Sequence, residues 1–325
     1  MTAAEDGDRQ ECAPVARCFV TRQLPGPALG RLQAAHQVDV WAGAEPPSPH
    51  ELAEGVSESE GLLTLLSDRV DGELIAHAPQ LRAISNYAVG YDNIDLRAAA
   101  VRGIPVGHTP NVLTDATADL AFALLLAAAR KLPEGIDEVR SGHAHTWEPA
   151  HNLGADVHGA TLGIIGFGRI GRAVARRAEG FSMQIVTTSS QSHPGAFQEL
   201  LERSDFVSLH TPLTSATHHL IDAAALARMK PTAILVNTAR GGLVDQPALA
   251  DALEDGLIAG AALDVTDPEP LPPDDPLLMA PNLIVVPHIG SATRTTRERM
   301  ADIAVDNLLA ALAGRPMPYQ VRVVS

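Results

Sequence analysis

The sequence predicts an α/β protein of two domains, each built on a parallel sheet, with a cleft between the domains. The chain has 325 residues, more than the roughly 250 to 300 at which a single hydrophobic core stops growing. Short apolar runs alternate with helical patterns, as parallel strands and their crossover helices do. The alternation occurs in two series, which one long helical pattern separates.

The first series predicts five strands of the first domain. Each apolar run is short and is followed by a polar or helical stretch. The runs begin at Cys18, near Val38, and at Gly61, Leu81 and Gly103.

A long helix is expected between the two series, over residues 110–130. Asp115 or Thr117 is the predicted N-cap, because short polar side chains bond the free N–H groups of a first helical turn. The apolar run 120–129 ends at Arg130, well short of the ~20 residues that a membrane-spanning helix needs. This segment is therefore predicted to be a buried helix.

The second series predicts six strands, with helices such as 198–203 and 246–254 between them. The runs begin at Ala160, Met183, Asp205, Thr232, Ile258 and Asn282. A helix over 291–313 and a strand-like end at 319–324 then return the chain to the first domain. The predicted domains are 1–109 with 292–325, and 110–291.

Charge and cysteine content exclude several classes of partner. The chain has 24 Lys and Arg against 39 Asp and Glu, a formal charge of −15, which disfavours nucleic acid and anionic membrane surfaces. The acidic N-terminal segment lacks the pattern of a secretory signal, so a short disordered tail and a cytoplasmic location are expected. Cys12 and Cys18 have no metal-site spacing, and no metal site is expected.

The stretch GIIGFGRIG, residues 163–171, predicts a dinucleotide site. It follows an apolar run and opens a helical pattern that ends at Gly180. In that setting Gly166 permits the tight turn, Gly168 lets the backbone approach a pyrophosphate, and Gly171 lets the helix pack closely on the strand. A purely structural glycine turn is the alternative.

The cofactor is expected to be NADP(H) in preference to NAD(H), although NAD(H) is possible. A site for NAD usually carries an acid about 20 residues after the glycines, which holds the ribose hydroxyls. Residues 183–198 contain no acid, so nothing there repels a 2′-phosphate. Ser189 and Ser190 offer hydrogen-bond donors instead. The alternative is a divergent surface loop.

Three polar residues follow strands of the second series, where open α/β sheets place their ligands. Arg240, Glu269 and His288 each have a structural explanation when taken alone. Together they suit the reduction of a 2-keto acid: a guanidinium to clamp the carboxylate, a histidine to supply a proton, and an acid to favour the protonated histidine.

These motifs, with NYAVGYDNID (86–95) and the 110–130 segment, make the chain resemble the D-isomer-specific 2-hydroxyacid dehydrogenase family, and within it the glyoxylate/hydroxypyruvate reductases. The family's fold is a pair of Rossmann-like or flavodoxin-like domains. The resemblance extends from about Cys18 to the C-terminus. It implies reduction of a small 2-keto acid to the D-2-hydroxy acid by hydride transfer from NAD(P)H, with a histidine as general acid.

The resemblance also implies roles for individual residues. Arg240 would bind the substrate and His288 would be the general acid, hydrogen-bonded by Glu269. Further substrate contacts would come from Leu66, Ser67, Val89 and Gly90. The cofactor would contact Thr117, Gly166, Phe167, Gly168, Arg169, Ile170, Gly171, Ser189, Ser190, Thr238 and Asp264.

Two features depart from the family pattern. His151 stands where reductases of this subgroup often have a tryptophan that reaches the neighbouring subunit's site, and the segment 188–204 is shorter than usual, as if a strand were trimmed. The region 110–148 resembles the family's dimer interface, so a homodimer is expected.

Two other functions remain open at this point. One is a non-catalytic, dinucleotide-sensing protein of the corepressor type, and the other is a phosphite-type oxidoreductase on the same fold. Glu269 argues against the formate type, which pairs its histidine with a glutamine.

Overall fold

The computed structural model describes residues 15–143 and 146–322, which divide into two compact units. Unit 1 contains residues up to Pro110 and from Arg297 onward, and unit 2 contains Asn111–Thr296. The predicted domains, 1–109 with 292–325 and 110–291, differ from these bounds by a few residues. The N-terminal segment predicted to be a tail, with Cys12, lies outside the described residues.

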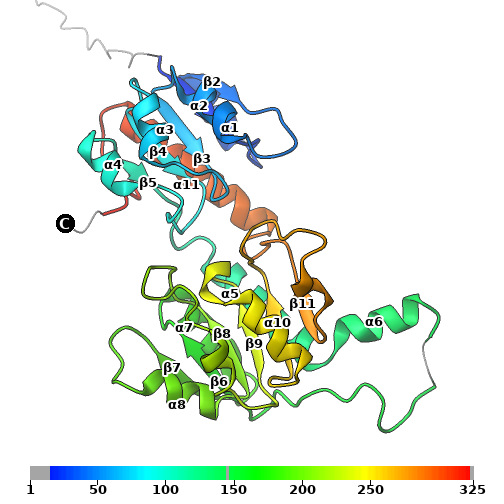
Figure 1. Ribbon diagram of the computed structural model, residues 1–325. Helices are drawn as coiled ribbons and strands as arrows, with labels where there is room; N and C mark the ends of the chain where they lie inside the picture. Colours follow the sequence, from blue (N-terminus) through cyan, green and yellow to red (C-terminus); the bar gives the residue numbers. More distant parts are fainter. Residues whose placement is uncertain (1–14, 144–145, 323–325) are drawn as a thin grey trace, which may run out of the picture. The chain divides into compact units, whose positions relative to one another are not determined.

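Unit 1 is a parallel sheet with strand order β2-β1-β3-β4-β5 (Figure 1). Its strands are β1 (Arg17–Val20), β2 (Gln37–Val40), β3 (Gly61–Thr64), β4 (Ala83–Asn86) and β5 (Val106–Gly107). Its helices are α1 (Ala28–Ala35), α2 (Pro49–Val56), α3 (Gly72–His77), α4 (Leu96–Val101) and, from residue 297, α11 (Arg294–Leu312). Helix α11 packs on β4, where Ser85 Oγ donates to the carbonyl of Ala304 at 2.8 Å.

Unit 2 is a parallel sheet with strand order β11-β10-β9-β8-β6-β7. Its strands are β6 (Thr161–Ile165), β7 (Gln184–Thr188), β8 (Phe206–Leu209), β9 (Ile234–Asn237), β10 (Gly260–Leu263) and β11 (Leu283–Val285). Its helices are α5 (Thr114–Ala129), α6 (Leu132–Arg140), α7 (Arg169–Glu179), α8 (Ala196–Arg203), α9 (Ala223–Leu226) and α10 (Gln246–Glu254), with short 3₁₀ turns at Gly241–Leu243 and Pro276–Met279.

Helices cover both faces of the unit 2 sheet, because successive strand residues point to opposite faces. On β6, Ile164 joins a core formed with α5 and α7, whereas Ile165 joins a core formed with α8, α9 and α10. Both clusters consist of buried hydrophobic residues, so both faces of the sheet are covered. Because all strand pairs are parallel, the carboxyl ends of the six strands lie at one edge of the sheet.

Two local predictions were wrong. Helix α5 begins at Thr114, with Leu113 as its N-cap and no side-chain cap, so Asp115 and Thr117 lie inside the helix. Asp115 pairs instead with Arg177 of α7. Of the predicted terminal strand 319–324, the described residues 319–322 form one antiparallel bridge, between Gln320 and the two-residue strand β5 at Gly107, and the last two residues lie outside the described part of the chain.

Among the described residues no helix has the length and apolarity to cross a membrane. Within the described residues, no group of three or more His, Cys, Asp or Glu is arranged to hold a metal.

Candidate active site

The glycine turn after β6 has the geometry expected of a pyrophosphate site. Gly166 has φ +94°, and a Cβ there would lie 2.5 Å from the carbonyl of His210. A Cβ on Gly171 would lie 2.3 Å from the carbonyl oxygen of Gly166, so helix α7 packs directly on the turn. At Gly168 a Cβ would meet no atom within 4 Å. The middle glycine thus faces open space in which a ligand fits.

Unused hydrogen-bond donors line the same turn. Within the described residues, the N–H groups of Phe167 and Gly168 donate no hydrogen bond. They stand at the N-terminus of α7, where the helix dipole favours an anion. Arg169 and Ile170 form the first turn of this helix. The turn therefore fits the phosphates of a dinucleotide.

The loop after β7 begins beside the glycine turn, since Gly166 N donates to the carbonyl of Thr188 at 2.8 Å. Ser189 Oγ accepts from Gln191 N, and Ser192 Oγ accepts from Ser189 N. Each hydroxyl still has its own hydrogen to donate. Ser190 is exposed. Exposed neutral donors thus occupy the position at which an NAD site has an acid.

The short segment 188–204 agrees with the prediction of a trimmed strand. The chain runs from β7 through α8 to β8, which pairs with the other side of β6. No strand lies between β7 and β8, where every residue is described. Strand β7 is therefore the edge of the sheet, beside the predicted adenosine site.

His288 and Glu269 are in direct contact. His288 Nδ1 donates to Glu269 Oε1 at 2.5 Å, and the two side chains are 22% and 33% exposed. Because this bond uses Nδ1, Nε2 is the nitrogen left to exchange a proton with a substrate. His288 has φ +50°, a left-handed conformation that is uncommon for a side chain with a Cβ and is found at functional sites.

Asp264, directly after β10, holds the backbone that carries His288. Its carboxylate accepts from the N–H groups of Ile289 at 2.6 Å and Gly290 at 2.8 Å, and its carbonyl accepts from His288 N at 2.8 Å. Burial raises the pKa of Asp264, while the two backbone hydrogen bonds and the nearby His288 oppose that rise. A Cβ on Gly290 would also contact Thr117, so Thr117 of α5 lies at this point.

Thr238 and Arg240 follow β9, the next strand in the sheet. Thr238 Oγ1 is buried and has no hydrogen-bond partner among the described residues, which fits an acceptor supplied by a ligand. The Arg240 guanidinium donates from Nη1 to the carbonyl of Ala239 at 2.8 Å. Asn237 Nδ2 fixes the Arg240 carbonyl at 2.8 Å, and the Asn237 carbonyl accepts from Asp264 N.

These contacts join four of the predicted residues of unit 2 into one connected group. The series runs from Arg240 through Asn237 and Asp264 to His288 and Glu269. Sequence reasoning missed Asn237, although its place at the end of β9 was a usable signal.

The predicted substrate loops of unit 1 are tied to each other by side-chain amides. Asn93 Nδ2 donates to the carbonyls of Leu65 and Asp68, each at 3.0 Å, and Asn93 Oδ1 accepts from Asn86. Asn86 Nδ2 also donates to the Gly90 carbonyl at 2.9 Å. One network therefore holds the loop of Leu66 and Ser67 and the loop of Val89 and Gly90.

The main-chain N–H groups of Val89 and Gly90 donate no hydrogen bond within the described part of the chain. They are thus free to bind an anion, as the predicted clamp requires. Leu66 and Ser67 are exposed. Asp68 is buried and accepts from Thr21 Oγ1, Thr64 Oγ1 and Leu65 N, so it anchors this loop.

His151, the residue in place of the family's tryptophan, contacts helix α6. Its Nε2 lies 3.0 Å from Glu138 Oε2, and Asn152 Nδ2 donates to Glu138 Oε1 at 2.8 Å. This part of the chain is thus fastened to α6 by polar contacts.

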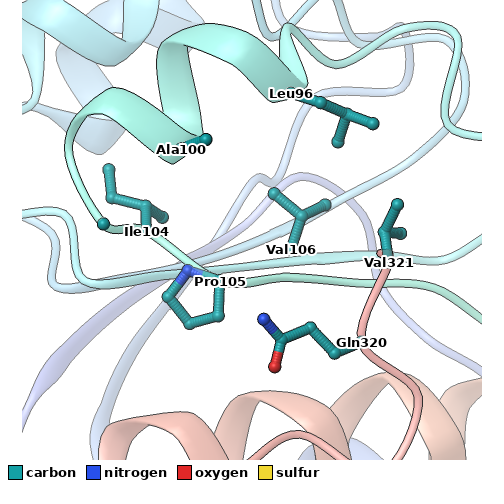
Figure 2. A pocket seen from close by; sticks show the side chains of 8 residues that line it. Leu96, Ala100, Ile104, Pro105, Val106, Gln320 and Val321 are labelled. Atoms are coloured by element: carbon teal, nitrogen blue, oxygen red, sulfur yellow. The ribbon is translucent and has the colours of Figure 1, made fainter. Parts of the chain in front are cut away.

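A separate pocket in unit 1 has a volume of about 210 Å³. Figure 2 shows apolar side chains of α4, β5 and the C-terminal segment around it, with the amide of Gln320 on one side. None of the predicted site residues lines it, and its lining offers no acid, base or nucleophile.

The chain is similar to proteins of known family over most of its length. Residues 122–290 match the family model described as D-isomer specific 2-hydroxyacid dehydrogenase, NAD binding domain. A protein named glyoxylate reductase from Korarchaeum cryptofilum is 50% identical over 94% of this chain and 95% of its own length. One of the same name from Thermococcus litoralis is 47% identical over 94% and 96%.

Solved structures are also similar to this chain over nearly its whole length. The TT0316 protein from Thermus thermophilus has a TM-score of 0.89 and 51% identity, covering 94% of this chain and all of its own. An NADPH-dependent glyoxylate/hydroxypyruvate reductase from Sinorhizobium meliloti, in complex with NADP and malonate, has a TM-score of 0.81 and 32% identity, covering 96% of this chain and all of its own.

Proposed function

Since the chain belongs to the D-isomer specific 2-hydroxyacid dehydrogenase family, we propose that it reduces glyoxylate or a closely related small 2-keto acid, with NADPH preferred over NADH. The single observation that carries this proposal is the 2.5 Å contact between His288 and Glu269 beside Asp264. It leaves one imidazole nitrogen free to act as a general acid at the edge of a dinucleotide-binding sheet.

The nicotinamide, when bound, supplies the hydride that reaches the carbonyl carbon. His288 gives the proton from Nε2 to the carbonyl oxygen, and Glu269 stabilises the protonated imidazole before transfer. Arg240 binds the substrate carboxylate, because a planar guanidinium makes two parallel hydrogen bonds to it. The unused N–H groups of Val89 and Gly90 are proposed as a second carboxylate contact.

The preference for NADPH rests on the loop after β7 and on one arginine. Ser189 and Ser190 present hydroxyl donors and no carboxylate, so a 2′-phosphate is accepted there. Arg172 is occupied with the carbonyl of Phe167 at 2.8 Å. Arg169 is exposed and makes no hydrogen bond or ion pair among the described residues. We therefore propose Arg169 as the cation that assists the phosphate.

Glyoxylate is proposed because the relatives of about 50% identity carry the name glyoxylate reductase. His151 stands where reductases of this subgroup often have a tryptophan, so the assay must decide which 2-keto acid is preferred. A bulky apolar 2-keto acid is not expected to be a good substrate.

A homodimer is proposed through helix α6. Leu132, Ile136 and Val139 recur at helical spacing and are all exposed, and α6 buries none of its residues. Such an apolar stripe on a surface helix is typical of a protein interface.

The test is a panel of 2-keto acids assayed with NADPH and NADH for wild type, His288→Ala and Arg240→Lys. Loss of the general acid should lower kcat by about 100- to 10,000-fold with cofactor binding kept. Arg240→Lys should also raise the substrate KM, since an ammonium cannot form the two-point clamp. Wild-type kcat/KM in either variant would refute the assignment, and a wild type that turns over no 2-keto acid would refute the function.

A further inference from the structure

The Gln246 side chain makes two hydrogen bonds to the main chain just before Glu269. Gln246 is the first residue of α10 and is only 7% exposed. Its Nε2 donates to the carbonyl of Asp267 at 2.8 Å, and its Oε1 accepts from Asp267 N at 2.7 Å. Both main-chain polar groups of Asp267 are therefore satisfied by one side chain, two residues before Glu269.

An amide suits this pair of contacts, and an ionised carboxylate does not. The main chain of Asp267 presents one donor and one acceptor, and the glutamine amide presents the complementary acceptor and donor. An ionised glutamate accepts only, so it would lose the bond to the Asp267 carbonyl and leave that carbonyl without its partner. The residue type is thus specified by the loop it holds, since helix α10 itself does not require a glutamine.

Thr266 and Asp267 are also packed closely against the turn that follows Arg240. A Cβ on Gly241 would lie 2.0 Å from the carbonyl of Thr266, so the turn after Arg240 lies against this segment without a gap. Thr266 Oγ1 donates to the carbonyl of Pro268 at 2.8 Å. The turn and Gln246 together hold residues 266–268, which directly precede Glu269.

We propose that Gln246 is a positioning residue for catalysis, which holds the Asp267 backbone so that the Glu269 carboxylate reaches His288. The inference rests on the proposed function, in which Glu269 stabilises the protonated His288. Gln246 itself contacts neither of these two side chains. Its effect therefore passes through the placement of a carboxylate, where a displacement of about 1 Å is enough to cost on the order of 100-fold in rate.

The main test substitutes Gln246→Glu, which preserves size and places an acid in the first turn of α10, where the helix dipole favours it. We expect kcat to fall by roughly 10- to 100-fold and the basic limb of the pH profile for reduction to move to lower pH, with the Kd for NADPH unchanged. Gln33→Glu is the matched control, because Gln33 is exposed on α1 and lies outside the proposed site. The control should behave as the wild type.

A double variant separates positioning from general damage. If Gln246 acts through Glu269, the Gln246→Glu change should have little further effect in a Glu269→Gln background. Additive losses of kcat, or a lower kcat with an unmoved pH profile in the single variant, would overturn the proposal. If Gln246→Glu does not fold, Gln246→Met replaces it in the comparison with Glu269→Gln. The same results for kcat and the pH profile then support or overturn the proposal.

A second readout does not depend on turnover. The low-field NMR signal of the His288 Nδ1 proton, assigned by its loss in His288→Ala, should weaken or move in Gln246→Glu and stay in Gln33→Glu. An unchanged signal would overturn the positioning role whatever the activity. If this signal responds while Glu269→Gln leaves the pH profile unmoved, the positioning role stands and the catalytic role proposed for Glu269 fails.

Discussion

The Nδ1 atom of His288 and the Oε1 atom of Glu269 are 2.5 Å apart, although the residues come from loops after two different strands, β11 and β10. Asp264 holds the backbone on the histidine side, and Gln246 holds the backbone on the glutamate side. The contact is therefore supported from both of its loops. A supported contact of this kind keeps the imidazole in one orientation, with Nε2 available for proton transfer.

Glu269→Gln should narrow the pH range of reduction. The carboxylate accepts the Nδ1 hydrogen bond and stabilises positive charge on the imidazole, whereas the neutral amide stabilises that charge less. Reduction needs the protonated imidazole as its proton donor. The basic limb of the kcat profile should thus move to lower pH.

The control for this prediction is Asp274→Asn, which removes one charge from an exposed position in the same proline-rich loop. Its pH profile should match that of the wild type. A Glu269→Gln profile that is scaled down without any movement of its basic limb would show that Glu269 acts in some other way.

The stability of the protein at mildly acidic pH should depend on His210. This residue follows β8, its Nε2 lies 2.8 Å from Ser208 Oγ, and burial lowers its pKa to about 4. The unfolded chain takes up the proton at about pH 6.5. Stability from the neutral histidine is thus complete above about pH 6.5 and is lost as the pH falls toward and through 4.

His210→Gln should remove this dependence. The free energy of unfolding, measured by urea denaturation from pH 7.5 to 4.5, should fall less steeply in the variant than in the wild type, by an amount on the order of 2 kcal/mol across the range. His158→Gln, at an exposed histidine of the same unit, is the control and should keep the wild-type slope. Equal slopes in wild type and His210→Gln would contradict the prediction.

The apolar stripe of α6 should carry the dimer contact. Replacing both Ile136 and Val139 by Asp places charge on a stripe where these side chains are 48% and 68% exposed. We expect the double variant to sediment as a monomer at concentrations where the wild type is a dimer, because charge is depleted from interface cores. Asp137→Arg alters charge on the same helix off the stripe, and it should stay dimeric. A double variant that remains a dimer would place the interface elsewhere.

Most of the fold was predictable because its signals are local. The eleven strands of the described residues are short apolar runs between turn residues, and the β6–α7 unit has three glycines whose separate demands can be read from their spacing. The start of α5 was not predictable in the same way. Two good capping residues, Asp115 and Thr117, lie inside the helix, since the turn at Asn111 starts it earlier than either.

The site was predictable as a set of strand-end residues, but its internal support was not. Arg240, Asp264 and His288 each follow a strand, so a rule about sheet edges finds them. The amides of Gln246 and Asn93 act on main-chain groups far along the chain or in neighbouring loops. Nothing in the local sequence distinguishes such an amide from one on the surface, because the partner is chosen by the tertiary fold.

The choice of cofactor should be reversible at a single residue of the loop after β7. Ser190 is exposed on the loop that begins beside Gly166, and residues 183–198 contain no acid. Ser190→Asp restores the type of side chain that binds ribose hydroxyls and repels a 2′-phosphate. Ser190→Asn is the matched control, because it has the shape of aspartate without the charge.

The ratio of kcat/KM for NADPH to that for NADH should favour NADPH modestly in the wild type, since the loop supplies neutral donors and only Arg169 supplies charge. It should fall by about 10-fold or more in Ser190→Asp and change little in Ser190→Asn. A wild type that prefers NADH, or an aspartate that leaves the ratio unmoved, would mean that the phosphate is recognised elsewhere or not at all.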